Sequence, residues 1–504
     1  MPPRSNSLLT TIAERNRQLR FNRNLLAILF SCFVLPFAVQ AQSSDRPNVV
    51  LILADDLGYT DISPFGSEIS TPNISRLAAQ GLSFTNYHTA ANCAPARAML
   101  LTGVDSHRNG VPNIPESIPP EQMAYDHYQG VLSDKVVTLA SLLQDNGYHT
   151  YMTGKWHLGH TPSLLPSARG FDRTIAMADA GADNWEQRIF LPIYDQANWY
   201  ADGTPHTLPD DFYSSEYFID KAIEFIDSNE SSDQPFFAYI PFQAVHTPVQ
   251  APKEYSDRYA GVYDKGWSVM REKRRQAAIA KGVIPADSQV KVTPGTPDWN
   301  ESTDEQKRYD ARRMEVYAGM VDAMDAHIGR LMSYLESIDE YDNTIFIFTS
   351  DNGAAEVEND WKFFESSGIY RGMKRDPYEG GIRVPLIAWH PKKIKANTSS
   401  DQIGYFADFL PTIADLAGVD PIVKVDGVSI STVLHGKGNK IKERYLYWEF
   451  YEKKGWRATR FGKWKAIQKN MHKGDQGAIE VYDLENDPSE KNDISSVNSK
   501  VLKK

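Results

Sequence analysis

The chain has 504 residues, of which 41% are hydrophobic and 24% charged, and its formal net charge is −11. This composition is that of a globular protein long enough for two domains, and its acidic balance argues against a protein that binds nucleic acid through a broad basic surface. Beyond the N-terminal segment, no stretch is apolar enough to cross a membrane.

The first 41 residues differ from the rest of the chain. Five arginines precede an apolar stretch at 25–39, and Val39-Gln40-Ala41 offers small residues for cleavage. The apolar stretch is too short for a comfortable membrane span, so residues 1–41 predict a cleaved signal peptide and an exported protein, periplasmic or secreted. A lipoprotein signal with Cys32 as the lipidated residue is the alternative, but the apolar run continues past Cys32 and Phe30 fits poorly.

Four short apolar runs predict strands of a mostly parallel sheet. They are rich in β-branched and aromatic residues and lack the alternation of half-exposed strands. The runs are Asn48–Ala54, 149–153, 236–242 and Thr344–Ser350. Helical patterns lie between and after them, at 71–81, 137–145, 312–338 and 406–416. Alternating strands and helices predict an α/β fold.

Polar residues follow each of these strands directly. Asp55 and Asp56 come after the first strand, and Asp351 and Asn352 come after the last. Ligands of open α/β sheets bind at the carboxyl ends of the strands, so we expect these side chains to meet at one edge. Carboxylate and amide oxygens suit Ca²⁺ or Mg²⁺ better than zinc. The two pairs therefore predict a divalent-cation site.

The two middle strands are followed by groups that carry positive charge or move protons. Lys155 and His157 follow the second strand, and His246 follows the third. Lys374 lies in a glycine-containing loop before a further expected strand at 381–386. For four other histidines a structural role is the better interpretation. These are His88, His107, His127 and His160.

The mature chain would keep a single cysteine, Cys93, which has no partner for an internal disulfide. Pro95 suits a first helical position, and residues 96–101 predict a short helix that ends at Gly103. Cys93 would then lie at a helix N-terminus, where backbone N–H groups favour negative charge, with Arg97 one turn on. A cleft that combines a cation, basic side chains and a nucleophile predicts a substrate with a tetrahedral anionic group, either a sulfate ester or a phosphate ester.

Two other regions complete the chain. Residues 253–312 form a polar insertion with a basic run around Arg274, which we expect to be a solvated surface excursion, with a flap or an oligomer contact as the alternative. From about residue 426 the chain is rich in strands, at Tyr445–Phe450, Trp456–Phe461 and 463–468, which predict a small antiparallel sheet.

These patterns divide the chain into three parts. The expected signal peptide covers 1–41, an α/β catalytic domain covers 45–420, and a small C-terminal subdomain covers 421–504.

Several motifs, in this order, make the chain resemble the formylglycine-dependent (type I) sulfatases of the arylsulfatase type, within the alkaline phosphatase superfamily. The motifs are Cys93-Ala94-Pro95-Ala96-Arg97, Gly154-Lys155-Trp156-His157-Leu158-Gly159, Ser350-Asp351-Asn352-Gly353, Gly380-Gly381-Ile382-Arg383-Val384-Pro385 and Tyr482-Asp483-Leu484 with Asp487-Pro488. The resemblance runs from about Pro47 to Ile494 and implies an alkaline-phosphatase-like fold.

The resemblance also implies a chemistry for the site. Cys93 is oxidised to Cα-formylglycine, whose hydrated aldehyde attacks sulfur and passes through a sulfo-enzyme intermediate. Ca²⁺, rather than Mg²⁺, assists. The implied metal ligands are Asp55, Asp56, Asp351, Asn352 and Cys93 as formylglycine.

Each matching side chain receives a role from the same resemblance. Asp351 helps to deprotonate the attacking hydroxyl, and His246 with Lys374 protonates the leaving alcohol. His157 deprotonates the second hydroxyl, which expels sulfate. Arg97 and Lys155 hold the formylglycine oxygens. The implied sulfate-binding residues are Lys155, His246 and Lys374.

The implied partners are a sulfated small molecule or saccharide and a formylglycine-generating or anaerobic maturase enzyme, with no nucleic acid and no integral membrane span. Two other functions stay open. A phosphonate monoester hydrolase or phosphodiesterase can share the scaffold and the cysteine signature. A non-enzymatic binding protein would keep the cleft with Cys93 unoxidised, although binding alone does not need His157. The expected pocket walls, at 178–188, around 194–204 and in the 253–312 insertion, carry no readable substrate signal.

Overall fold

The computed structural model describes residues 46–289, 296–356, 366–420, 424–437, 441–452, 454–471 and 477–496. The expected signal peptide, with Cys32, lies outside these residues. Within them, no helix combines the length and the apolar character needed to span a membrane.

The described residues form an 11-stranded sheet in the order β10-β2-β9-β8-β1-β7-β3-β4-β5-β6, with β11 beside β2. Its strands are β1 Asn48–Ala54, β2 Leu82–His88, β3 His149–Lys155, β4 Arg173–Met177, β5 Trp199–Ala201, β6 Thr204–Pro205, β7 Phe236–Pro241, β8 Thr344–Ser350, β9 Arg383–Trp389, β10 Thr398–Ser400 and β11 Gly404–Tyr405. The central strands β8, β1, β7, β3 and β4 are parallel, and β9 and β5 flank them in antiparallel orientation. The expected mostly parallel sheet is confirmed.

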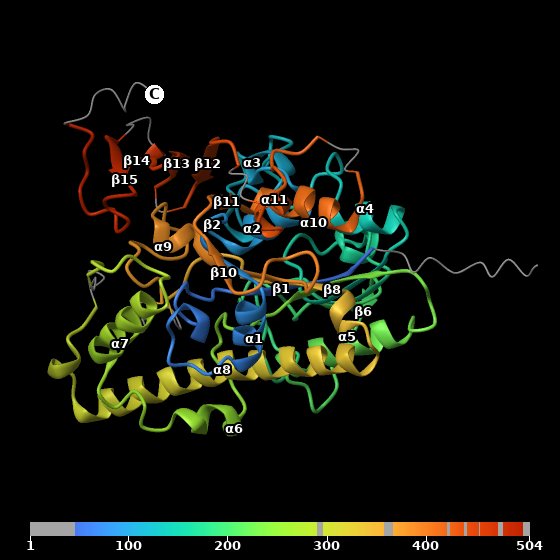
Figure 1. Ribbon diagram of the computed structural model, residues 1–504, viewed down its shortest axis with the longest axis horizontal. Coiled ribbons are helices and arrows are strands. Elements are labelled where there is room, and N and C mark those ends of the chain that lie inside the picture. Colours follow the sequence, from blue (N-terminus) through green and yellow to red (C-terminus); the bar gives the residue numbers. More distant parts are fainter. Residues whose placement is uncertain are drawn as a thin grey trace, which may run out of the picture. The chain divides into compact units, whose positions relative to one another are not determined.

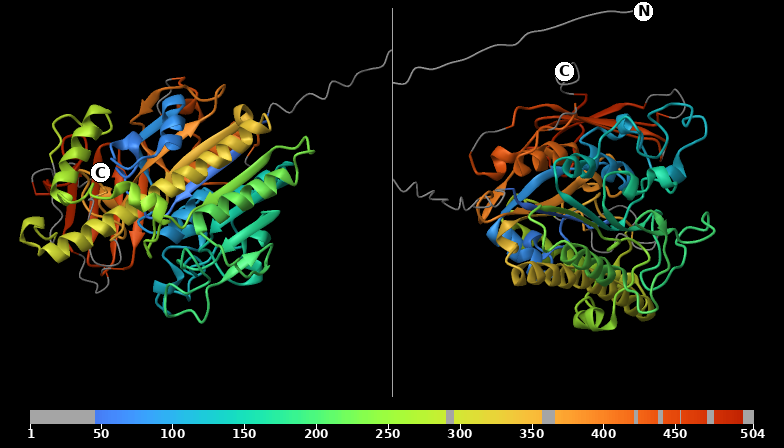
Figure 2. Two further views of the ribbon diagram at one scale, coloured as in Figure 1. Left: turned by 90° about the horizontal axis from the view of Figure 1, so that it is seen from below. Right: turned by 90° about the vertical axis from the view of Figure 1, so that its right-hand side faces the viewer.

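Helices cover both faces of this sheet (Figure 1). They are α1 Pro72–Gln80, α2 Cys93–Thr102, α3 Ser106–Asn109, α4 Leu139–Asp145, α5 Ser214–Asp227, α6 Lys253–Ser256, α7 Trp267–Ala280, α8 Asp304–Ser337, α9 Glu379–Ile382, α10 Phe409–Ala417 and α11 Ser431–Leu434. Helices α2, α4 and α10 share one core, and α1, α5, α7 and α8 share the other. Figure 2 shows the long helix α8 running beside α5 along the second face.

Strand β1 explains why both faces need a cover. Val49, Leu51 and Leu53 enter one core, whereas Val50 and Ile52 enter the other, because successive side chains of a strand point to opposite faces. All seven residues of β1 are buried. This is the reason that the run shows no polar alternation in the sequence.

Most expected elements are present, but several boundaries differ from the expected ones. Strands β1 and β8 match their predicted ranges, and the strand expected at 381–386 is β9, whose first residue is Arg383. Helix α2 begins at Cys93, so Pro95 is its third residue rather than its first. That position tolerates proline because the first four N–H groups of a helix have no intrahelical acceptor. Helix α8 begins at Asp304, eight residues before the predicted start, with Thr303 as its cap.

The insertion at 253–312 is not simply a solvated excursion, so that expectation was wrong in part. Arg274 of α7 is 3% exposed in its side chain and donates to Asp61 and Glu68, at 2.6 and 2.7 Å. Asp61 follows the Asp55-Asp56 pair closely in the chain. A residue of the basic run therefore binds the segment that follows β1. The polar composition of the insertion does not predict this contact.

The C-terminal region forms the expected antiparallel sheet, in the order β12-β13-β14-β15. The strands are β12 Tyr445–Phe450, β13 Trp456–Phe461, β14 Trp464–Lys469 and β15 Ile479–Asp483. The indole N–H groups of two tryptophans link this small sheet to loops of the large sheet by hydrogen bonds. Trp448 donates to the carbonyl of Thr89 at 2.7 Å, and Trp456 donates to that of Arg375 at 3.1 Å. The division of the chain at 420 and 421 stays a prediction.

Candidate active site

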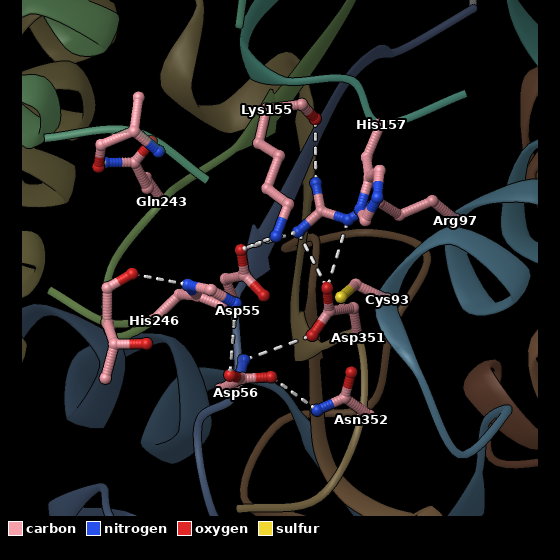
Figure 3. Close-up of polar contacts among 12 residues, drawn as sticks. Asp55, Asp56, Cys93, Arg97, Lys155, His157, Gln243, His246, Asp351 and Asn352 are labelled. Atoms are coloured by element: carbon pink, nitrogen blue, oxygen red, sulfur yellow. Dashed lines mark hydrogen bonds and ion pairs between the residues drawn. The ribbon is translucent and has the colours of Figure 1, made fainter. Parts of the chain in front are cut away.

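The carboxyl ends of β1 and β8 bring four oxygen-bearing side chains together (Figure 3). The parallel register sets Ala54 opposite Ser350, so the residues that follow each strand are neighbours. The backbone N–H of Asp56 donates to Asp351 Oδ1 at 3.1 Å, and Asn352 Nδ2 donates to Asp56 Oδ1 at 2.7 Å. All four side chains are buried. They are Asp55, Asp56, Asp351 and Asn352.

This edge fits a divalent cation. Oδ1 of Asp55 and Oδ1 of Asn352 are buried and have no hydrogen-bond partner among the described residues. Burial and the negative charge of Asp55 raise the pKa of Asp351 to about 6, although Arg97 opposes the shift. Oxygens without donors and carboxylates that repel one another are what a hard cation would satisfy. Ligand atoms of Asp55, Asp351 and Cys93 also lie within 4.8 Å of one another.

Cys93 is the first residue of α2 and is only 2% exposed. The side chain of Asn92 caps the helix by accepting the N–H of Cys93 at 3.0 Å. Burial alone would raise the pKa of the Cys93 thiol, but the charges of Lys155 and Lys374 and the nearby ring of His157 lower it. The surroundings of position 93 therefore stabilise negative charge.

Arg97 lies one turn along α2 and is completely buried. Its Nε and Nη2 donate to Asp351 Oδ2 at 3.0 and 2.7 Å, and its Nη1 donates to the carbonyl of Lys155 at 2.7 Å. The guanidinium thus ties α2 to the ends of β8 and β3. Figure 3 shows it between Lys155 and Asp351.

Two buried lysines face the carboxylates. Lys155, the last residue of β3, lies 2.5 Å from Asp55 Oδ2. Lys374 lies 2.7 and 2.9 Å from the two oxygens of Asp56. Burial alone would lower the pKa of Lys374, but Asp56 and the other acidic groups raise it above its ordinary value. Lys374 therefore carries its proton at neutral pH.

The pKa values of the two histidines are shifted in opposite directions. Burial alone would lower the pKa of His157, but Glu116 and Cys93 raise it above its ordinary value. Burial, Lys155 and Lys374 hold the pKa of His246 well below its ordinary value. His246 Nδ1 lies 2.6 Å from the carbonyl of Thr247, so its Nε2, 3.7 Å from Asp56 Oδ2, is the nitrogen that faces the site.

The structure brings every sequence-predicted site residue to this edge. It adds Glu116 and Gln243, which the sequence patterns missed, and Tyr194, which they placed only in an expected pocket wall. Glu116 and Tyr194 come from loops outside the expected strands, and Glu116 Oε2 lies 3.2 Å from His157 Nε2. Gln243, just past β7, donates to the carbonyl of Ala182 at 2.6 Å. Nothing in the local sequence marks these residues, because each acts through a contact distant in the chain.

Two of the histidines that we interpret as structural have clear partners elsewhere. His88 is buried beneath the small sheet, with Nε2 2.8 Å from Glu379 Oε2. His160 is partly exposed, lies 3.2 Å from Asp179 and packs on the ring of Tyr194. Among the described residues, neither hydrogen-bonds to the four oxygen-bearing residues, and His160 borders the site through Tyr194.

Comparison with protein families gives two overlapping matches. The family model described as Sulfatase matches residues 47–419. A second model, described as N-sulphoglucosamine sulphohydrolase, C-terminal, matches residues 368–503. Together they cover the large sheet with its site and the small sheet.

Individual proteins agree with these matches. The chain is 38% identical over 527 residues to an uncharacterized sulfatase of Schizosaccharomyces pombe, with 93% of each chain covered. It is 33% identical over 457 residues to an arylsulfatase of Klebsiella aerogenes, covering 82% of this chain and 98% of the relative. The crystal structure of Ps i-CgsB in complex with k-i-k-neocarrahexaose matches with a TM-score of 0.69 at 27% identity, covering 91% of this chain and 90% of the other.

Proposed function

The chain belongs to the sulfatase family and is a sulfuric ester hydrolase, and we propose that it acts through a formylglycine formed from Cys93 beside a bound Ca²⁺. One observation carries this proposal: three buried carboxylates, two lysines and two histidines converge with Cys93 at one edge of the sheet. A cleft of this composition suits a sulfate ester, because it combines cations for the anionic group with acid and base groups for proton transfer.

A formylglycine at position 93 would supply a hydrated aldehyde whose hydroxyl attacks the sulfur of the ester. The surroundings of Cys93 support this assignment. Position 93 opens α2, where free backbone N–H groups favour negative charge. Lys155 and Lys374 contribute positive charge, and the ring of His157 contacts the same side chain.

A cation at this edge would be held by Asp55, Asp56, Asp351 and Asn352 together with the group at position 93. It would supply positive charge that polarises the ester and the attacking group. We propose Ca²⁺ because Mg²⁺ demands near-ideal octahedral geometry and usually keeps several waters. The two buried oxygens without donors, on Asp55 and Asn352, support a cation of either kind.

The sulfate group would lie against Lys155, Lys374 and His246. Lys374 enters the reaction protonated, and the hydrogen bond from His246 Nδ1 to the carbonyl of Thr247 leaves Nε2 facing the site. An anionic ester beside His246 opposes the effect of the lysines and favours a protonated imidazole. We therefore assign protonation of the leaving oxygen to His246 together with Lys374.

The remaining side chains hold or accept protons at position 93. Arg97 places two donors on Asp351 Oδ2, which fixes the carboxylate that we assign to deprotonation of the attacking hydroxyl. We assign His157 as the base for the second hydroxyl. Arg97 also shares the neutralisation of charge with Lys155.

The substrate that we propose is a sulfated small molecule or saccharide. The likeness to the Klebsiella aerogenes arylsulfatase supports the first class, and the neocarrahexaose complex of Ps i-CgsB supports the second. A formylglycine-generating or anaerobic maturase enzyme would modify Cys93. The segment at 1–41 supports export to the periplasm or the medium.

The test starts with protein co-expressed with a formylglycine-generating enzyme. Peptide mass spectrometry should find a loss of about 18 Da at Cys93, the change from thiol to aldehyde in an activated nucleophile. Sulfate release from para-nitrophenyl sulfate should follow, should stop in EDTA and should return with Ca²⁺ better than with Mg²⁺. Cys93→Ala is the control and should be inactive while it folds normally.

Two results would contradict the proposal. Turnover of phosphonate or phosphodiester substrates far above that of sulfate esters, with the aldehyde present, would assign the site to phosphorus chemistry. Binding of sulfated saccharides without turnover, again with the aldehyde present, would make the protein a binding protein.

A further inference from the structure

Glu116 is a carboxylate that the family motifs do not include, and it contacts His157. It lies in the short helix η2 Pro115–Ser117, outside the large sheet, and its side chain is 8% exposed. One oxygen, Oε2, lies 3.2 Å from His157 Nε2. The other, Oε1, accepts a hydrogen bond from the hydroxyl of Tyr194. Both oxygens are thus held by defined donors.

This contact decides which nitrogen of His157 carries the proton in the neutral ring. An ionised carboxylate only accepts hydrogen bonds, so Nε2 must be the N–H donor and Nδ1 keeps its lone pair. Nδ1 is buried and has no hydrogen-bond partner in the described part of the chain. The ring of His157 meanwhile contacts Cys93. A base oriented by a third group is the arrangement that activates a nucleophile.

The backbone conformation of His157 supports the same interpretation. Its φ is 58°, in the left-handed region that residues other than glycine rarely adopt. Such a conformation costs on the order of 1 kcal/mol and persists where surrounding contacts hold it. The Glu116 contact is one of these, because it fixes the ring that the strained backbone presents to Cys93.

We propose that Glu116 is a positioning residue for sulfate ester hydrolysis, which holds His157 with its proton on Nε2 so that Nδ1 accepts the proton of a hydroxyl at position 93. The proton leaves that oxygen and arrives at Nδ1, while Glu116 stays ionised and stabilises the imidazolium. Tyr194 keeps the carboxylate in place. This inference rests on the proposed function.

The first experiment does not need the modified enzyme. Protein with unmodified Cys93 and ¹⁵N-labelled histidine is compared with Glu116→Gln and Glu116→Ala by ¹⁵N NMR, with His157→Gln used to assign the signal. At a pH high enough to deprotonate the imidazolium, the wild type should show a single Nε2–H form of the neutral ring. Glu116→Ala should lose it and show averaging of both tautomers, whereas Glu116→Gln should keep it because the amide oxygen still accepts.

The second experiment measures kinetics after the aldehyde at position 93 has been confirmed by mass spectrometry. Glu116→Ala should lower kcat about 10–100-fold with KM within twofold, the range seen when a group that orients a site residue is removed. Glu116→Gln should recover part of this loss. Tyr194→Phe should lower kcat about fivefold, the value of one hydrogen bond.

Glu121→Gln is the matched control, because Glu121 is an exposed acid on the same loop and should leave kcat and the NMR signal unchanged. A Glu116→Ala protein that keeps one tautomer, or keeps kcat within twofold of the wild type, overturns the inference. Failure of the proposed function is distinguishable, because a wild type that carries the aldehyde but releases no sulfate leaves the NMR result standing.

Discussion

Two buried charge clusters invite comparison, one at the ends of β1 and β8 and one beneath the small sheet. In the second cluster Lys465 Nζ lies 2.9 Å from Glu379 Oε1 and 2.9 Å from Glu490 Oε1. His88 and Arg460 reach the other oxygen of Glu379, at 2.8 and 3.4 Å. The carboxylates of this cluster therefore find their counter-charges within the protein.

The first cluster uses the same kinds of residue differently. Lys155 and Lys374 neutralise one oxygen of Asp55 and both oxygens of Asp56, yet Oδ1 of Asp55 and Oδ1 of Asn352 have no partner among the described residues. Burial of charge by itself therefore does not mark a functional site. Ligand atoms that lie close enough to share one cation do, such as those of Asp55, Asp351 and Cys93, which lie within 4.8 Å of one another.

The largest expected effect is on stability, in the cluster beneath the small sheet. Lys465→Met should lower the free energy of unfolding by about 3–5 kcal/mol, because it leaves two buried carboxylates without their shared cation. Chemical denaturation measures this. Lys469→Met, on the same strand but with its pair at the surface, is the control and should cost less than about 1 kcal/mol. Equal losses of unfolding free energy in the two variants would contradict the expected difference between a buried and a surface ion pair.

The matching change at the active-site edge should act on catalysis instead. Lys374→Met should lower kcat/KM by about 10²–10³, the effect of removing a charge that stabilises the transition state. Its free energy of unfolding should fall less than that of Lys465→Met, because a bound cation can still neutralise Asp56. Steady-state kinetics and denaturation of the same sample decide this. A Lys374→Met protein that unfolds easily while its kinetics stay normal would reverse the comparison.

Added metal should stabilise the protein through the first cluster and not through the second. Ca²⁺ at about a hundredfold excess over its Kd should stabilise the unmodified protein by roughly 2–3 kcal/mol, as binding to the native state alone requires. Thermal denaturation with and without Ca²⁺ measures the shift. Asp55→Asn should abolish it, whereas Lys469→Met should keep it in full. A shift that survives Asp55→Asn would place the cation elsewhere.

The smallest expected effect is on the pH dependence of stability. Burial and Glu379 raise the pKa of Glu490 from 4.5 to about 7, although Lys465 opposes the shift. The folded state then holds a proton that the unfolded state has lost, so this stabilisation is complete below about pH 4.5 and is lost as the pH rises through about 7. Glu490→Gln should reduce the fall in unfolding free energy between pH 5 and 7 by about 1–2 kcal/mol. An unchanged slope would contradict this assignment.

Much of the large sheet and its edge could be predicted from the sequence. The run Asn48–Ala54 is buried on both faces, so its composition alone identifies a central strand. Asp55 and Asp351 follow β1 and β8 directly, and parallel pairing brings them together without help from distant segments. Helix α2 lies where the sequence predicts it, but it begins two residues before Pro95, because the side chain of Asn92 caps it at Cys93.

Contacts between distant segments could not be predicted. Arg274 in the polar insertion meets Asp61 from 213 positions away, so its burial has no local signal. Glu116 reaches His157 from a loop without periodicity, and Tyr194 joins it from a third segment. Such pairs depend on how loops pack, which the spacing of residues along the chain does not encode.

The sequence by itself determined the strands of the central sheet, the position of Cys93 at the start of a helix and the family of the protein, because hydrophobic runs and short motifs are local features. The tertiary structure alone decided which charges neutralise one another and which stay open. Lys465 pairs with Glu379 and Glu490, whereas ligand atoms of Asp55, Asp351 and Cys93 lie within 4.8 Å of one another, where a cation could bind. The reason is that electrostatic pairing depends on distances of a few ångströms, which only the packed fold sets.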